Sequence, residues 1–197
     1  EKAVQRGLNL EARERDLICL TGTNGSGKST LLRTLAGLQP ALNGKVMIAD
    51  KDIASLNVHQ RSTLFSLVLT DDIDIERLTV RELVAMGRFP YTNWAGALSD
   101  YDHKIIDKAL QDVHLAHKAD AMINQISDGE KQRAVIAKAL TQDTPLVLLD
   151  EPTAHLDLPN RIEIMLLLRR LSVSTGKSFI LSTHELDLAL QMADKIW

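Results

Sequence analysis

An eight-residue segment, Gly22-Thr23-Asn24-Gly25-Ser26-Gly27-Lys28-Ser29, constrains the fold of this chain more than any other feature. It follows the apolar run 17–20 and precedes a helix-like pattern at 30–35. A strand, a glycine-rich turn and a helix in this order are typical of a loop that binds phosphate. Glycines let successive backbone N–H groups point at one anion, and the helix presents the positive end of its dipole. The sequence therefore predicts a phosphate site, in which Lys28 reaches the β- and γ-phosphates and the Ser29 hydroxyl binds Mg²⁺.

Composition and charge narrow the class of protein. The chain has 197 residues, enough for one domain with a modest insertion, and 45% of them are hydrophobic. A net charge of −3 argues against bulk binding to nucleic acid or to anionic lipid. The single cysteine, Cys19, lies in an apolar run, so we expect a buried thiol in a reducing compartment.

The ends and the apolar runs of the sequence bear on where the protein acts. No apolar run approaches the roughly 20 residues that span a bilayer, and no secretory signal is visible, so we expect membrane association through a partner. The chain opens without Met and stops in the strand-like segment 195–197, so we expect a fragment of a longer protein.

A second motif lies at the end of a buried strand pattern. The apolar run 146–149 leads into Asp150 and Glu151. Ligands of parallel sheets bind at the carboxyl ends of strands, where the phosphate loop also lies. We therefore expect Asp150 to hold Mg²⁺ and Glu151, on the opposite side of the strand, to polarise an attacking water. Without the phosphate loop, a strand that runs into an acidic turn would explain the pattern as well.

A third motif begins a strong helical pattern at 129–141. Ser127 and Glu130 have the spacing of a capping box, which needs no function. Gly129, however, permits a close backbone approach, and this helix start is suited to receive a phosphate. One ATP does not need two phosphate-receiving helix starts from one molecule, whereas two facing molecules would use both.

Strand patterns alternate with helical patterns along most of the chain, which predicts a doubly wound α/β core. We expect this core to comprise 1–70 and 146–197, and a helical subdomain, ending in the helix at 129–141, to occupy 71–145. The strand patterns lie at 4–10, 17–20, 44–48, 64–69, 146–149 and 179–182.

Five motifs in this order resemble those of an ABC-type ATP-binding cassette: the Walker A loop, the signature, Walker B, the D-loop and the switch histidine. They are Gly22 to Ser29, Ile126 to Arg133, 146–152, Thr153 to Asp157, and Ser182 to Glu185. The resemblance implies a P-loop NTPase (RecA-like) fold with a mainly parallel sheet, an N-terminal antiparallel β part and an α-helical insertion.

The resemblance also implies a mechanism. ATP would lie between the Walker A loop of one chain and the signature of a second copy in a head-to-tail dimer. Glu151 would be the general base, His184 would contact the γ-phosphate, and Lys28 would act on the phosphates. The nucleotide-binding positions carried over are Gly22, Thr23, Asn24, Gly25, Ser26, Gly27, Lys28, Ser29, Thr30, Ser127, Gly129, Glu130 and Asp157. Those carried over for Mg²⁺ are Ser29, Asp150 and Thr70.

The sequence departs from the family pattern at three places. The signature has Ile126, Asp128 and Glu130 where the family often has Leu, Gly and Gln. The glutamine that usually follows the strand at 64–69 is here Thr70, which has a shorter reach; Asp71 or Asp72 are alternatives. The aromatic residue on which adenine stacks is expected before the first strand, and no aromatic residue precedes Phe65.

The loop from Met86 to Tyr91 resembles cassettes of bacterial importers for iron-siderophores, haem and cobalamin. This resemblance implies an ATPase at the cytoplasmic face of the membrane, bound to permease subunits and served indirectly by a periplasmic or surface substrate-binding protein, with no nucleic-acid partner. Tyr91 and Trp94 either receive a permease helix or pack onto the helical insertion. His114 and His117 are expected to be solvated helix positions and not metal ligands.

Two other functions fit parts of the sequence. One is a soluble ABC-type ATPase that acts on DNA or ribosomes, although the long heptad runs of the chromosome-type members are absent. The other is a regulatory module that binds ATP without hydrolysing it. The presence of Glu151 and His184 argues against this module, whereas Thr70 argues for it.

Overall fold

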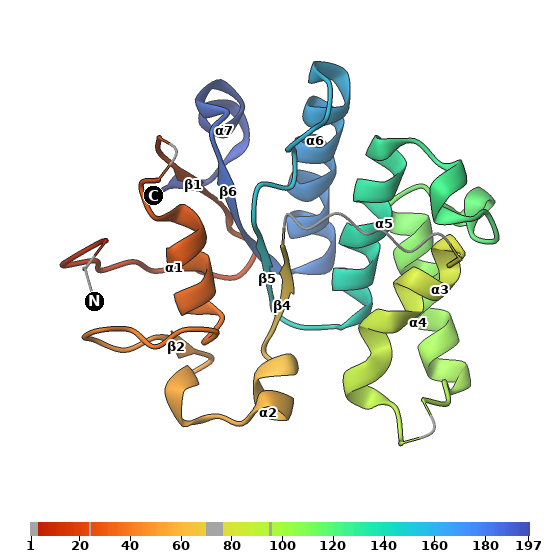
Figure 1. The fold of residues 1–197 in the computed structure, drawn as a ribbon, viewed down its shortest axis with the longest axis horizontal. Coiled ribbons are helices and arrows are strands. Elements are labelled where there is room, and N and C mark those ends of the chain that lie inside the picture. Colours follow the sequence, from red (N-terminus) through yellow and green to blue (C-terminus); the bar gives the residue numbers. More distant parts are fainter. Residues whose placement is uncertain (1–3, 24, 70–76, 95) are drawn as a thin grey trace.

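The computed structural model describes residues 4–23, 25–69, 77–94 and 96–197 (Figure 1). Its centre is a parallel sheet with the strand order β4-β5-β6-β1-β7. The strands are β1 (Leu17–Thr21), β4 (Phe65–Val68), β5 (Leu146–Leu149), β6 (Ser178–Thr183) and β7 (Lys195–Ile196). The predicted parallel α/β core is therefore confirmed.

The strands are mainly apolar because both faces of the sheet are covered. Side chains of a strand alternate between the faces, so Ile18 packs with Leu32 of α1 (Lys28–Leu35) on one face. Leu17 belongs to the larger core on the other face, together with Leu168 of α6 (Leu158–Thr175) and Leu188 of α7 (Leu186–Met192). Figure 1 shows α1 on one side of the sheet and α6 on the other.

A group of helices lies beyond one edge of the sheet (Figure 1). It comprises α3 (Val80–Ala85), the 3₁₀ helix η2 (Met86–Tyr91), α4 (Asp100–Asp112) and α5 (Asp128–Thr141). The capping boxes Thr79/Glu82 and Ser127/Glu130, both read from the sequence, begin α3 and α5. Gly87 allows η2 to touch α5, because a Cβ there would lie 2.1 Å from the Lys138 carbonyl oxygen.

The small elements complete the described chain. They are β2 (Met47–Ile48) and β3 (Lys51–Asp52), which form an antiparallel pair, η1 (Ile53–Ser55), α2 (Val58–Ser62), η3 (Ala116–Lys118) and η4 (Ile123–Gln125). The predicted strand at 4–10 is wrong: these residues are exposed coil, with no neighbouring strand to pair with in the described part of the chain. The pattern at 44–48 forms a strand only at its last two residues. No helix within the described ranges is long and apolar enough to cross a membrane.

A buried ion pair joins three of the helical elements. Arg88 Nε donates to Asp102 Oδ1 at 2.7 Å, and its Nη1 donates to the Thr141 carbonyl oxygen at 2.9 Å. Both charged side chains are almost fully buried. Hydrogen bonds from the Ser99 hydroxyl and N–H, together with Arg88, lower the pKa of Asp102 to about 2. This pair therefore anchors η2 and the start of α4 to the end of α5.

Replacing Asp102 by Asn should destabilise the protein by about 3 kcal/mol at pH 7, because a buried guanidinium loses its counter-charge. A carboxylate whose pKa is lowered on folding stabilises the fold above its unfolded pKa, near 3.8, and loses that effect as pH falls through about 2. The difference in the free energy of unfolding between the variant and the unmodified protein should therefore become smaller between about pH 4 and pH 2. Urea unfolding at several pH values measures it.

Asp107→Asn provides a control on the same helix. Asp107 pairs with Arg81 at 2.6 Å, but both side chains are well exposed. This variant should lose at most about 1 kcal/mol. Equal losses in the two variants would contradict the role given to the buried pair.

Candidate nucleotide-binding site

The predicted phosphate loop connects β1 to α1. Gly22, Gly25 and Gly27 have positive φ angles of 151°, 79° and 96°, which L side chains rarely adopt. A Cβ at Gly22 would also lie 2.7 Å from Ser26 Oγ. Asn24 lies outside the described residues. The described part of the loop therefore has the tight glycine turns that a phosphate cradle requires.

Lys28, the first residue of α1, is held inside this turn. Its side chain is buried, and Nζ donates to the carbonyl oxygens of Gly22 at 2.7 Å and Thr23 at 3.3 Å. An ammonium group can exchange such carbonyl partners for phosphate oxygens, with which it pairs as an opposite charge. The described loop thus presents one cation beside a helix start that points N–H groups outward.

Asp150, directly after β5, joins three elements through its carboxylate. Oδ1 accepts hydrogen bonds from Ser29 Oγ of α1 at 3.0 Å and from Ser182 Oγ of β6 at 2.6 Å. Asp150 is 5% exposed. A hydroxyl and a carboxylate oxygen at this separation are hard oxygen donors of the type that Mg²⁺ takes, so the residues present fit the ion.

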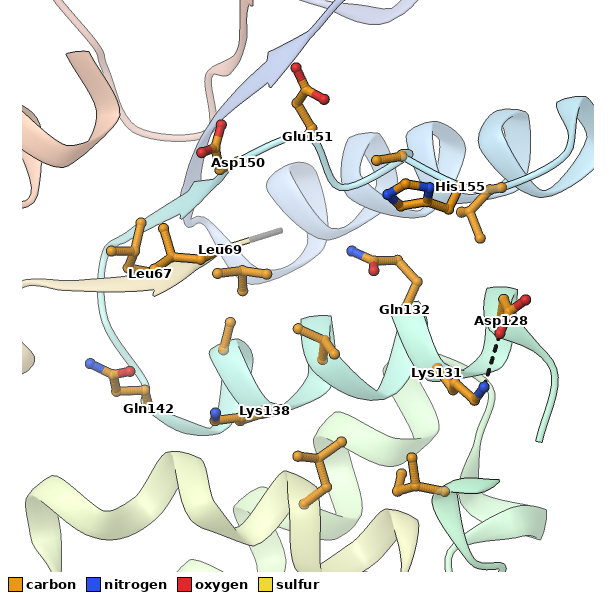
Figure 2. Close-up of a pocket in the computed structure, with 17 residues that line it drawn as sticks. Leu67, Leu69, Asp128, Lys131, Gln132, Lys138, Gln142, Asp150, Glu151 and His155 are labelled. Atoms are coloured by element: carbon orange, nitrogen blue, oxygen red, sulfur yellow. Dashed lines mark hydrogen bonds and ion pairs between the residues drawn. The ribbon is translucent and has the colours of Figure 1, made fainter. Parts of the chain in front are cut away.

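Glu151 follows in a left-handed backbone conformation with φ of 46°. Its N–H donates to Ser182 Oγ at 2.8 Å, which holds this unfavourable conformation in place. Because β5 ends at Leu149, a turn and not strand alternation orients the side chain, unlike the expectation from the sequence. Figure 2 shows both carboxylates at one end of the pocket that they line.

His184 follows β6 and stands next to Glu151. Its Nδ1 is 4.0 Å from Glu151 Oε2, and its Nε2 is 3.4 Å from Glu185 Oε1. The imidazole is about half exposed. The end of β6 therefore places the predicted histidine beside the predicted base, with one ring edge open to solvent.

Asp157 is the N-cap residue of α6. Its side chain caps the helix by accepting from the N–H of Asn160 at 3.2 Å. In this chain the predicted D-loop aspartate therefore has a structural partner within its own helix.

The predicted signature residues lie at the start of α5. The Ser127 and Glu130 capping box forms, with Glu130 Oε2 2.9 Å from the Ser127 nitrogen. An ion pair with Lys118 at 2.6 Å, together with the Ser127 hydrogen bonds, lowers the pKa of Glu130 to about 2. Gly129 is buried, and a Cβ there would lie 2.4 Å from Asn160 Oδ1 of α6.

A cavity of about 680 Å³ lies between the carboxyl ends of β4 and β5 and the side of α5. Asp150 and Asp128 lie towards opposite ends of it, as Figure 2 shows. Among the described residues, no hydrogen bond or ion pair joins 127–130 to the phosphate loop. One chain thus brings together the loop, Ser29, Asp150, Glu151 and His184, and leaves the signature apart.

Several contributors to this site have contacts that the sequence did not predict. Ser182 Oγ donates to the Asp150 carboxylate and accepts from the Glu151 N–H, although the sequence showed it only as a member of the switch-histidine motif. The contacts of Asn160 and Glu185 become visible only when α6 and β6 are placed beside their neighbours. Thr70, with the alternatives Asp71 and Asp72, lies outside the described residues. His114 and His117 are both exposed, as expected, but His114 lies in the turn after α4 and not in a helix, where it contacts Arg170 at 2.5 Å. No metal-ligand cluster occurs among the described residues.

Comparison with known proteins agrees with this geometry. The model of the ABC transporter family matches residues 5–154. The petrobactin import ATP-binding protein FpuD of Bacillus anthracis is 36% identical over 96% of this chain and 69% of its own length. The iron(3+)-hydroxamate import ATP-binding protein FhuC of Bacillus subtilis (strain 168) is 35% identical over 98% of this chain and 72% of its own. The dimeric structure of MJ0796, a bacterial ABC transporter cassette, superposes with a TM-score of 0.80 at 30% identity, covering 98% of this chain and 84% of that one.

The fold and the matched family define a P-loop ATPase of the cassette type. The chain belongs to the ABC transporter family, as its motifs indicated, and is one of that family's ATP-hydrolysing subunits.

The contact between Gly129 and Asn160 can be tested by a double-mutant cycle. Gly129→Ala should destabilise the protein by about 2 kcal/mol, because the new methyl group would overlap the Asn160 amide. In an Asn160→Ala background the same substitution should cost clearly less, since the colliding group is gone. Urea unfolding of the two single variants and the double variant gives the coupling free energy between positions 129 and 160. Additive losses of stability would contradict the contact between Gly129 and Asn160.

Proposed function

We propose that this chain hydrolyses Mg·ATP to drive the import of an iron chelate (siderophore), haem or cobalamin through a separate membrane permease. The observation that carries the proposal is the hydrogen-bond network of Ser29, Asp150, Ser182 and Glu151 beside the phosphate loop. It places oxygen donors for a cation and the Glu151 carboxylate beside the phosphate loop. Binding of ATP alone would not need Glu151 in a strained turn next to His184.

The phosphate loop binds the triphosphate in this proposal. Its backbone N–H groups and the start of α1 surround the phosphates, and Lys28 leaves the Gly22 and Thr23 carbonyls to pair with the β- and γ-phosphates. The contacting positions are Gly22, Thr23, Asn24, Gly25, Ser26, Gly27, Lys28, Ser29 and Thr30. Ser29 and Asp150 hold Mg²⁺, with Thr70 as a further candidate. When bound, Mg²⁺ neutralises charge on the β- and γ-phosphates.

Glu151 acts as the general base in this scheme. Its carboxylate takes the proton of the attacking water, whose oxygen attacks the γ-phosphorus in line as the bond to the bridging oxygen breaks and ADP leaves. His184 donates to a γ-phosphate oxygen and stabilises charge in the transition state. The 4.0 Å between His184 Nδ1 and Glu151 Oε2 supports this assignment, because one γ-phosphate and its water can touch both groups.

A second copy of the chain completes the site. Ser127, Gly129 and Glu130 at the start of α5, together with Asp157, face the ATP held by the partner's phosphate loop. The separation of the signature from the loop within one chain supports a head-to-tail pair, as does the dimeric state of MJ0796. ATP binding closes the pair and hydrolysis reopens it, so the interface is the element with two states.

The surface that we assign to the permease comprises η2, the loop after it and the start of α4. Tyr91 is fixed, since its hydroxyl donates to the Gln142 carbonyl at 2.8 Å and Arg88 stacks on its ring at 4.0 Å. Trp94 is 99% exposed, and Phe89 and Tyr101 are more than half exposed. Exposed aromatic side chains on a rigid base are typical of interface anchors. Residues 71–145 would move as one helical subdomain with the permease, and 1–70 with 146–197 as the ATP-binding core.

The names of FpuD and FhuC support import of a ferric chelate. In this setting the chain acts at the cytoplasmic face of a bacterial inner or plasma membrane. A periplasmic or surface substrate-binding protein delivers the chelate to the permease, and nucleic acid has no part.

The ATPase proposal predicts that Glu151→Gln lowers the rate of ATP hydrolysis by at least about 100-fold, while ATP still binds. With Mg·ATP the variant should double its mass in light scattering from 21.8 kDa to twice that value. A Ser127→Arg substitution added to it should prevent the doubling, because the partner's signature can no longer approach the phosphates.

Glu163→Gln is the matched control, since the Glu163 side chain is 61% exposed and its ion pair, with Arg133, is apart from the phosphate loop and Glu151. It should leave turnover unchanged. Full turnover in Glu151→Gln would overturn the assignment of the base, and ATP binding without any hydrolysis by the unmodified protein together with its permease would favour a regulatory module.

The permease surface makes a separate prediction. Trp94→Ala should leave ATP hydrolysis by the isolated cassette unchanged, because its ring touches solvent. It should weaken capture of the permease by about tenfold or more, as for a central aromatic anchor. Capture from detergent extracts measures this effect, with Tyr101→Ala as a second position, and unchanged capture in both variants would place the permease elsewhere.

A further inference from the structure

We propose that Glu185 and Arg161 are positioning residues that fix the imidazole of His184 for phosphate contact. This inference rests on the role proposed for His184. Neither residue is adjacent to the phosphate loop, and neither would touch the nucleotide. Their effect passes through the orientation of one ring.

Glu185 Oε1 contacts two groups from different elements. It is 3.4 Å from His184 Nε2, and it forms an ion pair with Arg161 Nη1 of α6. The Glu185 and Arg161 side chains are 24% and 31% exposed, whereas His184 is 49% exposed. The better covered pair can therefore serve as a fixed support for the more mobile ring.

Each member of the Glu185–Arg161 pair also makes a hydrogen bond that involves the backbone. Arg161 Nε donates to the Leu156 carbonyl at 2.7 Å, so the guanidinium bridges the turn before α6 and the Glu185 carboxylate. The Glu185 N–H donates to Thr183 Oγ1 at 3.0 Å, which fixes the turn between β6 and α7. Because the guanidinium is planar and already held by the Leu156 carbonyl, it loses little further freedom when it pairs with the Glu185 carboxylate.

The two ring nitrogens of His184 face two carboxylates. Nδ1 lies towards Glu151 Oε2 at 4.0 Å and Nε2 towards Glu185 Oε1 at 3.4 Å. Glu185 thus limits rotation of the side chain about its Cα–Cβ and Cβ–Cγ bonds, and keeps the Nδ1 edge directed towards Glu151. Without it, the half-exposed imidazole would sample other rotamers, and the productive one would be less populated.

Arg161 also explains how an acidic side chain is tolerated here. An unpaired carboxylate next to His184 would repel the negative γ-phosphate that the ring is proposed to contact. The guanidinium neutralises that charge on the side turned to α6. The pair therefore orients the ring at little electrostatic cost to the bound phosphate.

The arrangement links two loops that are distant in sequence. Leu156 lies in the turn before α6, and the Arg161 bridge ties its carbonyl to the residue after His184. A displacement of this turn would move the support of the ring. We therefore expect the orientation of the His184 ring to change when the turn before α6 moves.

The test compares Glu185→Gln and Arg161→Gln in the unmodified chain and in a His184→Ala background. In the unmodified chain each should lower kcat about tenfold and change KM by less than about twofold, because orientation and not binding is affected. In the His184→Ala background neither should lower kcat further. Arg161→Lys, which keeps the charge and loses one of two contacts, should restore part of the activity.

Ring spectra of His184 provide a readout that needs no turnover. In two-dimensional ¹H–¹³C spectra of the protein without nucleotide, both substitutions should shift the His184 Cε1 signal. The control Glu163→Gln, which removes an ion pair at another face of α6, should leave it unchanged. Urea unfolding establishes that the variants fold.

The outcomes separate this inference from the proposal on which it rests. If His184→Ala leaves kcat unchanged, the role of His184 itself is overturned. If His184→Ala lowers kcat, and Glu185→Gln either has no effect or lowers kcat equally in both backgrounds, the positioning role alone is overturned. An unshifted His184 signal in both variants would also overturn it.

Discussion

The hydrogen bonds made by the Asp150 carboxylate organise the rest of the site. Three elements that are distant in sequence, α1, β5 and β6, meet at Oδ1 through Ser29 and Ser182. The same Ser182 hydroxyl accepts from the Glu151 N–H and so holds the next residue in a left-handed turn. One buried carboxylate thereby sets the position of the phosphate loop relative to the proposed base.

The sheet makes this arrangement possible because it is covered on both faces. Ile18 and Leu17, adjacent in β1, belong to different cores, so β1 cannot shift towards either face without exposing apolar side chains. The polar atoms of Lys28, Asp150 and Ser182 then lie at the carboxyl edge of a rigid layer. The helices beyond the edge are tied to one another by Arg88 and Asp102, which suits a part that moves as a unit.

Much of the core could be predicted from the sequence, because the local motifs and the spacing of the apolar residues indicate the same elements there. The Gly22 to Ser29 motif, the apolar run of β5 and the capping box of α5 each reported a feature that the structure contains. The exposed segment at 4–10 looked like a strand because its apolar and polar residues alternate, but alternation without a neighbouring strand does not form a sheet. Strand alternation likewise failed to describe Glu151, since the strand ends two residues earlier.

Tertiary contacts account for what the sequence could not supply. Two contacts depend on how α6 lies against α5 and β6, which no local sequence pattern encodes. They are the contact of Asn160 with Gly129 and the ion pair of Arg161 with Glu185. The sequence explained Gly129 by the approach of a phosphate, whereas within the chain a Cβ there would meet the Asn160 side chain. The two explanations are compatible, because one concerns the backbone N–H and the other the missing Cβ.

The central claim is that Asp150 and Ser29 together hold the cation that accompanies ATP. Calorimetric titration of ATP into the protein, with Mg²⁺ and then with a chelator, tests it most directly. Mg²⁺ should strengthen ATP binding by the unmodified chain, and Asp150→Asn should lose that gain while keeping its affinity for ATP in the chelator. An undiminished Mg²⁺-dependent gain in Asp150→Asn would contradict the account.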